Sequence, residues 1–239
     1  MIKAINLRKY YGNRTVLKGI DINISRGEIV GFLGPNGAGK TTAFSIILGL
    51  IDSDGGTVLY EDVDISEYPM YKRAQLGMAL LPQEYSIFKE LTTMDNLLAV
   101  LENSVKKSTK RTYYLDYFLS RFGLIKVKYQ LAKTLSGGEK RRLEIARALA
   151  NFPRYIFMDE PFTGIDPITI NDIQKIVREL KDEGIGLVIS DHNIRDTLKI
   201  TDRAYIMVEG EILKEGIPSE LIEDPIIKEK YLGKEIKIN

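Results

Sequence analysis

The chain has 239 residues, and 34 Lys and Arg against 33 Asp and Glu give a formal net charge of +1, which argues against a protein that mainly coats nucleic acid. No cysteine and one histidine are present, which excludes disulfides, thiolate chemistry and cysteine or multi-histidine metal sites. With 44% apolar and 28% charged residues the chain is globular, and its length suits one large α/β domain or two small ones.

No membrane span is predicted. The longest nearly apolar stretch covers residues 43–51 and stops at Asp52, whereas a membrane helix needs roughly 20 residues. The N-terminus lacks the basic start, apolar stretch and small-residue cleavage site of a secretory signal. We therefore expect a soluble protein in a reducing compartment, with any membrane part supplied by another chain.

Short apolar runs and turn residues alternate in the first third of the chain. Ile2, Ala4 and Asn6 alternate with their neighbours, which is typical of a half-buried strand. Further strands are predicted at 16–24, 28–33 and 76–81, a buried helix at 40–50, and a turn at 54–56, where aspartate precedes two glycines.

The composition then changes. Residues 92–150 are rich in Leu, Lys, Arg, Glu and Tyr, which favours helices. A stripe of aromatic residues and one arginine recurs at helical spacing, and we interpret it as facing a core rather than a ligand. The stripe comprises Tyr114, Tyr117, Phe118, Arg121 and Phe122. We interpret the basic run 106–111 as a solvated loop between helices; contact with anionic lipid is the alternative.

Strand and helix patterns alternate again from residue 155. Strands are predicted at 155–158 and 185–190, and helices at 168–183 and 193–200. Alternating strands and helices indicate a mostly parallel sheet covered by helices, so the helical stretch before them is interpreted as an insertion into an α/β core.

Residues 34–41, Gly-Pro-Asn-Gly-Ala-Gly-Lys-Thr, match the pattern G-x-x-x-x-G-K-[ST] between a predicted strand and helix. Glycines let successive N–H groups face a phosphate, and the helix N-terminus adds positive potential. We expect Lys40 to reach the β- and γ-phosphates of a nucleoside triphosphate and Thr41 to offer its hydroxyl to Mg²⁺. The nucleotide-binding residues predicted here are Gly34, Pro35, Asn36, Gly37, Ala38, Gly39, Lys40, Thr41 and Thr42.

A second site is predicted at the end of the strand at 155–158, where Asp159 and Glu160 follow. An acid that ends an apolar strand lies at the carboxyl edge of the sheet, where open α/β folds bind their ligands. We expect Asp159 to hold Mg²⁺ through water and Glu160 to polarise an attacking water. A plain surface turn is the alternative, and the phosphate loop upstream favours the functional interpretation.

Residues 135–139, Leu-Ser-Gly-Gly-Glu, precede a helical pattern. Ser136 with Glu139 three residues later forms a capping box, and a capped helix end with exposed amides also attracts anions. The chain thus has two candidate anion sites, although one nucleotide needs only one phosphate loop.

These three motifs together resemble the nucleotide-binding subunit of an ABC transporter, and the resemblance covers essentially the whole chain. It implies an α/β fold of the ABC ATPase type: a P-loop NTPase core, with a mostly parallel sheet and an antiparallel β subdomain, carrying an inserted α-helical subdomain. It also implies a single domain over 1–239, with a RecA-like core at about 1–84 and 152–239 and a helical subdomain at about 85–151.

The resemblance assigns further roles. Tyr11 is expected to stack on adenine, Gln83 to sense Mg²⁺ and the membrane partner, and the lone His192 to contact the γ-phosphate. The implied catalytic residues are Glu160, His192, Lys40 and Gln83. The implied metal residues are Thr41, Gln83 and Asp159.

The family also explains the second anion site. Two copies are expected to pair head to tail, so that Ser136, Gly137, Gly138 and Glu139 of one cover the ATP held by Lys40 of the other. Asp166 is a further expected nucleotide-site residue. Implied cofactors are ATP and Mg²⁺. Implied partners are a second copy and two integral membrane subunits, with no nucleic acid, at the cytoplasmic face of the inner membrane.

Two positions depart from the commonest family pattern. Glu139 stands where glutamine is usual, and Thr163-Gly-Ile-Asp166 replaces a more usual serine-containing loop while keeping the aspartate. Glutamate is tolerated at the first position, because the backbone amides and the Ser136 hydroxyl matter more than that side chain.

A finer resemblance is to the ATPases of lipopolysaccharide export systems. It rests on residues 81–91, 135–147, 159–167, 190–198 and 231–233. Phe88, in the stretch 86–89, is expected in the groove that receives the coupling helix of the membrane subunits. Branched-chain amino acid import is the alternative, followed by an ABC ATPase that acts on DNA or ribosomes. A regulatory module without turnover is disfavoured, because Glu160 and His192 are both present.

Overall fold

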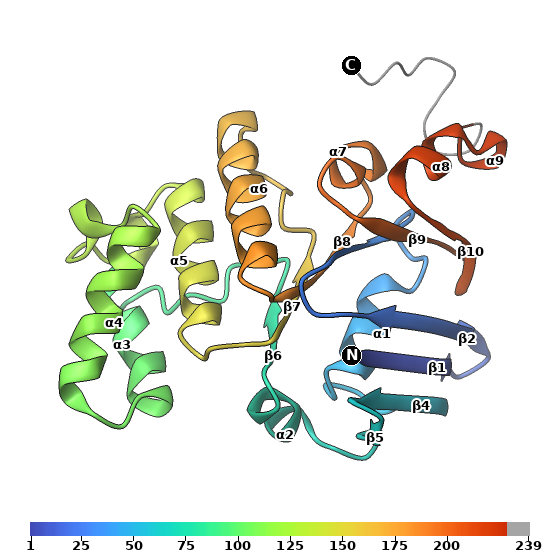
Figure 1. Cartoon of the computed structure of the whole chain (residues 1–239), viewed down its shortest axis with the longest axis horizontal. Coiled ribbons are helices and arrows are strands. Elements are labelled where there is room, and N and C mark those ends of the chain that lie inside the picture. The colour runs from blue at the N-terminus through green and yellow to red at the C-terminus, as the bar shows by residue number, and fades with distance from the viewer. Residues whose placement is uncertain (229–239) are drawn as a thin grey trace.

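A six-stranded sheet runs through the middle of the molecule in the order β10-β9-β3-β8-β7-β6 (Figure 1). The computed structural model describes residues 1–228. The strands are β3 (Ile29–Leu33), β6 (Met78–Leu81), β7 (Tyr155–Asp159), β8 (Gly186–Asp191), β9 (Arg203–Val208) and β10 (Glu211–Gly216). All neighbours pair in parallel except β9 and β10, which confirms a mostly parallel sheet.

A smaller antiparallel sheet has the order β2-β1-β4-β5. Its strands are β1 (Ile2–Tyr11), β2 (Arg14–Ile24), β4 (Gly55–Tyr60) and β5 (Val63–Asp64). Helix α1 (Lys40–Ile47) shares one buried cluster with both sheets. Its Phe44 ring lies 5.8 Å from the ring of Phe32 and 5.2 Å from that of Phe157, which holds the start of α1 against the carboxyl edge of the large sheet.

Most of the remaining helices cover the other face of the large sheet or one end of the molecule, whereas the first of them lies beside α1, where its Arg73 donates to the carbonyl oxygens of Ile46 and Ile47. These helices are α2 (Met70–Gln75), α3 (Thr93–Ser104), α4 (Ser108–Arg121), α5 (Gly137–Leu149), α6 (Pro167–Asp182), α7 (Ile194–Leu198), α8 (Pro218–Glu223) and α9 (Pro225–Ile227), with 3₁₀ turns at Ile125–Val127 and Ala132–Thr134. Figure 1 shows α3, α4 and α5 together at the end opposite the antiparallel sheet. No helix in residues 1–228 is long and apolar enough to cross a membrane.

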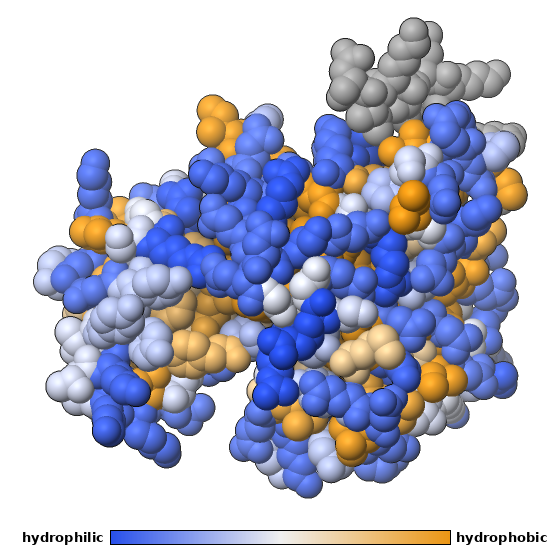
Figure 2. Space-filling model, in the orientation of Figure 1, coloured by the Kyte–Doolittle hydropathy of each residue, from blue (hydrophilic) through white to orange (hydrophobic). Residues whose placement is uncertain are grey.

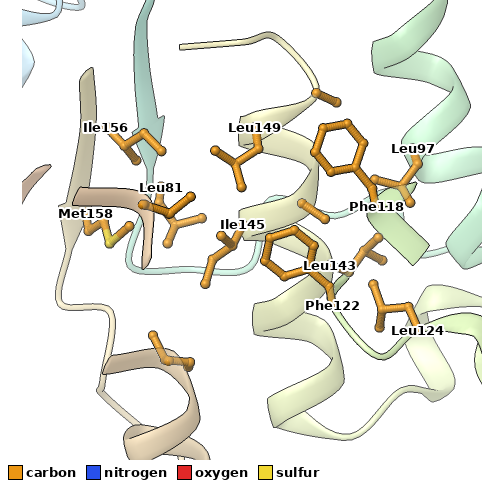
Figure 3. Close-up of a cluster of buried hydrophobic side chains, with 14 of the residues drawn as sticks. Leu81, Leu97, Phe118, Phe122, Leu124, Leu143, Ile145, Leu149, Ile156 and Met158 are labelled. Carbon is orange, nitrogen blue, oxygen red and sulfur yellow. The ribbon is translucent and has the colours of Figure 1, made fainter. Parts of the chain in front are cut away.

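A single apolar cluster joins the helical end to the sheet. Leu143, Ile145 and Leu149 of α5 lie between Leu81 of β6 and Phe118 of α4 (Figure 3). On the same face of the sheet, Ile173, Val177 and Leu180 of α6 are fully buried, as their i, i+4, i+7 spacing predicts. Helix α5 therefore packs on the core as well as on its neighbouring helices.

Two details of the antiparallel sheet correct the sequence prediction. The alternation in β1 breaks at Asn6, which adopts a φ of +51° at a register shift, so Leu7 rather than Asn6 is buried with Ile2 and Ala4. The glycines predicted to form a turn at 54–56 instead begin β4. Gly56 has a φ of +89°, and a Cβ there would lie 2.4 Å from the Asn6 carbonyl oxygen. Only glycine therefore lets β1 and β4 approach so closely at this position.

The helical end also differs in part from expectation. Phe118 and Phe122 of the aromatic stripe are buried, whereas Tyr117 is exposed and Arg121 forms an ion pair with Glu183 at 2.6 Å. The stripe is therefore only partly a core stripe. The sequence predicts a loop for the basic run 106–111, but Ser108 begins α4, so four of its six residues are helical. Residues 231–233, used for the finer resemblance, lie outside the described residues.

Candidate functional site

Four neighbouring strands bring the predicted site residues to one edge of the large sheet. The phosphate loop follows β3, residues 191 and 192 end and follow β8, Asp159 and Glu160 end and follow β7, and Gln83 follows β6. Because β3, β8, β7 and β6 are adjacent and parallel, their carboxyl ends meet. The site therefore forms where an open α/β sheet is expected to bind ligands.

The phosphate loop needs its glycines for conformation and close packing. Gly37 and Gly39 have φ values of +79° and +105°, in the left-handed region, and Gly39 directly precedes the first residue of α1. A Cβ on Gly34 would lie 2.1 Å from the Met207 carbonyl oxygen of β9. The loop thus fits tightly against the sheet and presents its amides at the start of the helix.

Lys40 lies inside this loop, only 5% exposed, and its Nζ donates to the carbonyl oxygens of Gly34 at 2.7 Å and Pro35 at 3.0 Å. Burial lowers the pKa of the Lys40 ammonium, and the nearby carboxylates of Glu160 and Asp159 oppose that shift. An anion at the loop would offset the cost of burying this charge.

Thr41 and Asp159 come together from distant parts of the chain. The Thr41 hydroxyl donates to Asp159 Oδ2 at 3.0 Å, and the hydroxyl of Ser190 on β8 donates to Asp159 Oδ1. Hydroxyl and carboxylate oxygens are hard ligands that suit Mg²⁺. Within residues 1–228 no group of three or more acidic or histidine side chains could hold a metal alone. The donors present fit Mg²⁺, which characteristically completes its shell with water and substrate phosphates.

Both the backbone and the side chain of Glu160 are held by hydrogen bonds. Its backbone has a φ of +44°, which is uncommon for a residue with a side chain, and its N–H donates to the Ser190 carbonyl oxygen at 2.9 Å. Its Oε2 accepts hydrogen bonds from Gln83 Nε2 at 3.0 Å and from the Thr163 hydroxyl at 3.1 Å. The carboxylate is therefore held at the edge of the site by groups from two segments.

His192 approaches the same carboxylate from β8. Its Nδ1 lies 3.3 Å from Glu160 Oε1 and 3.6 Å from Asp191 Oδ1, and about half of the side chain is exposed. Asp191 is only 2% exposed, and burial raises the pKa of its carboxyl. The exposed side of the imidazole leaves His192 free to contact a ligand.

A cavity of about 560 Å³ opens beside these groups. Its lining includes Tyr11, Asn36, Gly37, Gly39, Lys40, Thr41, Thr42, Gln83 and Glu160. Tyr11 is 53% exposed at the rim, with the Lys9 ammonium 5.5 Å from its ring centroid. The volume suits a nucleotide-sized ligand, with an aromatic ring at one end and the phosphate loop at the other.

The motif 135–139 does not line this cavity. The Ser136 hydroxyl accepts from the Glu139 N–H at 3.3 Å, and Glu139 Oε2 accepts from the Ser136 N–H at 2.8 Å, which confirms the predicted capping box. A Cβ on Gly138 would lie 2.9 Å from the Thr169 hydroxyl, so α6 leaves no room for a side chain there. The capped end of α5 is consequently a surface separate from the cavity beside the phosphate loop.

Asp166 also lies outside the cavity lining. It caps α6, where its carboxylate accepts from the N–H groups of Ile168 and Thr169 and from the Thr169 hydroxyl at 2.6 Å. These hydrogen bonds lower the pKa of the Asp166 carboxyl, the Thr169 hydroxyl most of all. Asp166 therefore caps α6, and its expected role at the nucleotide site stays a prediction.

Phe88 is 49% exposed, and the Arg147 guanidinium of α5 lies 4.6 Å from its ring centroid. Buried Asn96 holds the Phe88 backbone, because its side chain accepts from the Phe88 N–H and donates to the Phe88 carbonyl, each at 2.9 Å. A large groove lies nearby between α2 and the ends of α3 and α5 (Figure 2). Phe88 is not among its lining residues.

Some residues of the site could not be recognised from the motifs. Arg14 and Val16 line the cavity with Tyr11. In the sequence, the one feature that points to them is the basic charge of Arg14, three positions after the predicted stacking tyrosine. Buried Arg141 of α5 donates to the carbonyl oxygens of Pro82 at 3.1 Å and Pro161 at 3.2 Å, next to Gln83 and Glu160. These contacts join residues about 20 to 60 positions apart.

Comparison with known proteins gives the family. A family model described as ABC transporter matches residues 17–163. The chain is 44% identical over 238 residues to the lipopolysaccharide export system ATP-binding protein LptB of Acidithiobacillus ferridurans, covering 100% of this chain and 99% of that protein. It is 47% identical over 237 residues to a probable ABC transporter ATP-binding protein of Azorhizobium caulinodans, covering 99% and 84% of the two chains.

A solved structure agrees. The chain matches the dimeric, post-hydrolysis state of an ATP-binding cassette bound to ADP and phosphate, with a TM-score of 0.81 and 26% identity, over 91% of this chain and 99% of that one. The predicted fold class is thereby confirmed. With the family model spanning more than half of its length and full-length relatives above 40% identity, the chain belongs to the ABC transporter family, as one of its ATP-binding, ATP-hydrolysing subunits.

Proposed function

We propose that this chain is the ATPase of a lipopolysaccharide export system, and that it works as a homodimer on two integral membrane subunits at the cytoplasmic face of the inner membrane. The observation that carries the proposal is the 44% identity to a lipopolysaccharide export ATP-binding protein over 100% of the chain. The finer sequence resemblance in residues 81–91 and 190–198 supports the same assignment.

ATP binding is assigned to the phosphate loop and to the cavity beside it. The amides of the loop and Lys40 take the phosphates, and Tyr11 stacks on adenine at the open rim. To do so, the Lys40 ammonium exchanges its two carbonyl partners for phosphate oxygens. Thr41, Asp159 and Gln83 would hold Mg²⁺, which when bound neutralises phosphate charge and orients the triphosphate.

Hydrolysis is assigned to Glu160, which orients and polarises the attacking water. A positioned base typically contributes roughly 10²- to 10⁴-fold. Gln83 and His192 already contact this carboxylate, at 3.0 and 3.3 Å. Both side chains can therefore shift when the γ-phosphate is cleaved. His192 would hold the γ-phosphate with its exposed side.

The signature motif 135–139 is assigned to the ATP of the partner copy. Its amides end a capped helix and lie away from the cavity that Lys40 lines, so one chain cannot use both on one nucleotide. Pairing head to tail resolves this, because each ATP then bridges Lys40 of one copy and Ser136 of the other. Hydrolysis removes the bridging charge, and the dimer opens.

Coupling to the membrane subunits is assigned to the surface around Phe88. The neighbouring groove, of about 880 Å³, is lined partly by exposed apolar side chains, Met70, Tyr71 and Phe152 among them. An amphipathic helix of a partner fits such a groove. The same proposal divides the chain into a RecA-like core, at about 1–84 and 152–239, and a helical subdomain, at about 85–151. The groove then lies at the boundary between the two parts.

We expect Phe88→Ala to weaken partner binding or uncouple ATP hydrolysis from transport, while leaving the ATPase rate of the isolated chain nearly unchanged. Its ring contacts Arg147 and solvent rather than the ATP cavity. Tyr129→Ala is the matched control, an exposed aromatic of the same helical end. Co-purification and coupled transport would be measured; intact values of both in Phe88→Ala would exclude this role.

The export assignment is tested by affinity purification from native membranes, followed by mass spectrometry. A Glu160→Gln variant is used as bait, because it should hold ATP and its partners. Recovery of two small polytopic subunits of the lipopolysaccharide export type supports the proposal. Amino acid permease subunits with a periplasmic binding protein would indicate import instead. Recovery of only ribosomes or DNA-repair proteins would end the transport assignment.

A further inference from the structure

The Glu160 carboxylate has a hydrogen-bond donor that no motif assigns. The Thr163 hydroxyl donates to Glu160 Oε2 at 3.1 Å, beside the Gln83 amide at 3.0 Å. The Thr163 N–H also donates to the Glu160 carbonyl oxygen at 3.2 Å, which closes a tight turn over 160–163. The turn brings the hydroxyl under the carboxylate three residues earlier in the chain.

Gln83 and Thr163 differ in where they are anchored. Gln83 comes from the segment after β6, and the proposed cycle gives it a second task at Mg²⁺ and the membrane partner. Thr163 shares a turn with Glu160 itself, so its hydrogen bond does not depend on the segment that carries Gln83. His192 approaches the other oxygen, Oε1, at 3.3 Å, and has its own proposed task at the γ-phosphate.

The Thr163 hydroxyl has no competing structural duty. The cap of α6 is Asp166, which receives its hydrogen bonds from Ile168 and Thr169. Thr163 is exposed, so removing its hydroxyl leaves no buried polar group unpaired. Its one side-chain hydrogen bond is to the carboxylate.

We propose that Thr163 is a positioning residue for hydrolysis: it fixes the rotamer of the Glu160 carboxylate through the cycle, so that the base meets the attacking water in a reactive orientation. The inference rests on the proposed role of Glu160. A hydrogen bond to a charged acceptor contributes enough free energy that its loss from the transition state lowers the rate about tenfold. The effect falls on turnover rather than on ATP binding, because Thr163 does not line the ATP cavity.

The test compares Thr163→Val, which removes the hydroxyl at nearly constant volume, with Thr163→Ser, which keeps it. Steady-state ATP hydrolysis by the purified full chain with Mg²⁺ gives kcat and KM. We expect Thr163→Val to lower kcat about 5- to 20-fold, with KM for ATP within about twofold and kcat for Thr163→Ser within about twofold of the original chain. Thr112→Val, an exposed hydroxyl on α4, is the control and should change neither constant.

A second measurement separates positioning from assembly. In a Glu160→Gln background, ATP-dependent dimer formation is followed by size-exclusion chromatography with light scattering, with and without Thr163→Val. Unchanged dimerisation supports the proposal. An unchanged kcat in Thr163→Val, an equal loss in Thr163→Ser, or loss of the dimer would overturn it. Full hydrolysis by Glu160→Gln alone would instead refute the proposed base, which is a distinguishable result.

Discussion

Asp191 is a buried acid that the proposed reaction does not use. It ends β8 beside the phosphate loop, and its Oδ1 accepts from the Asn193 N–H at 2.8 Å. Burial raises the pKa of its carboxyl, and the negative charge of Glu160 acts in the same direction, whereas the Asn193 N–H and His192 oppose it. The ionised form is therefore less favourable in the folded chain than in the unfolded one.

We expect Asp191→Asn to raise the melting temperature at pH 8 and to lose that advantage as the pH falls. A raised folded-state pKa means that stability is lost as the pH rises from the ordinary value of 3.8 through the folded value, and asparagine does not titrate. Each kcal/mol of change in the free energy of unfolding shifts the melting temperature by about 2–4 °C in a domain of this size.

The measurement is thermal unfolding of both chains at pH 8 and pH 4.5. Asparagine keeps an oxygen for the Asn193 N–H, so the comparison isolates the charge. If the original chain melted higher at pH 8, the Asp191 carboxylate would be stabilised by its surroundings and the argument would fail.

At the scale of an element, helix α5 unites a cap, a buried ion pair and the contact with Phe88. Its first turn carries the capping box of Ser136 and Glu139. One turn later Arg141 and Glu144, 3% and 2% exposed, pair at 3.0 Å. Glu144 also accepts from the N–H of Ser86, while Arg147 donates to the Ser86 carbonyl oxygen at 2.7 Å. The helix is thus hydrogen-bonded to the segment after β6.

Ser136→Ala should lower the free energy of unfolding by about 1 kcal/mol through loss of the cap, and should also prevent the ATP-dependent dimer. Glu139→Gln should change the free energy of unfolding by no more than about 0.5 kcal/mol, since glutamine also completes a capping box. Urea unfolding and light scattering with ATP measure the two effects. A Ser136→Ala chain that still dimerises would show that the hydroxyl does not reach the partner's ATP.

Glu144→Ala should destabilise the fold by about 3–5 kcal/mol, because it leaves the buried Arg141 charge without its partner. The pair of half-buried Arg111 and exposed Glu102, 3.7 Å apart, lies at the surface and provides the control. Glu102→Ala should cost about 0–1 kcal/mol, as is usual for exposed pairs. Urea unfolding at neutral pH compares the two variants, and equal losses would contradict the importance of burial.

At the scale of the whole molecule, the two candidate anion sites lie on different surfaces of one chain, and the proposed dimer would complete both. We expect Glu160→Gln with ATP and Mg²⁺ to double its mass in light scattering, and the original chain to return to monomer as ATP is consumed. ATP that binds the dimer more tightly than the single chain shifts the equilibrium toward the dimer by mass action. Addition of EDTA should weaken the Glu160→Gln dimer, since the metal balances the phosphate charge.

Adding Lys40→Ala to Glu160→Gln gives the matched negative control. Lys40 is the buried cation of the phosphate loop, and its loss removes the charge that we propose binds the triphosphate. A dimer that formed equally well without ATP, or with the Lys40→Ala change, would show that the nucleotide is not what joins the copies.

The sequence by itself determined the parts that depend on near neighbours. The phosphate loop, the Ser136–Glu139 capping box and the acids that end β7 are each encoded within a few residues, because backbone conformation and strand ends follow local spacing. The order of strands and helices then implied a parallel sheet, whose carboxyl edge collects the site. Local patterns failed where a distant strand intervened, as at Asn6 and Gly56.

Only the tertiary structure decided which groups meet. The Thr41 hydroxyl and Asp159 are 118 positions apart, and Gln83 and Glu160 are 77 apart, yet each pair lies within hydrogen-bonding distance. Such pairs depend on strand order and register. The same local sequence patterns are compatible with several strand orders, so they do not fix which groups meet. The contact of the Thr163 hydroxyl with Glu160 and the pair of Arg141 and Glu144 each join residues three positions apart, but the burial of the Arg141–Glu144 pair follows from packing rather than from spacing.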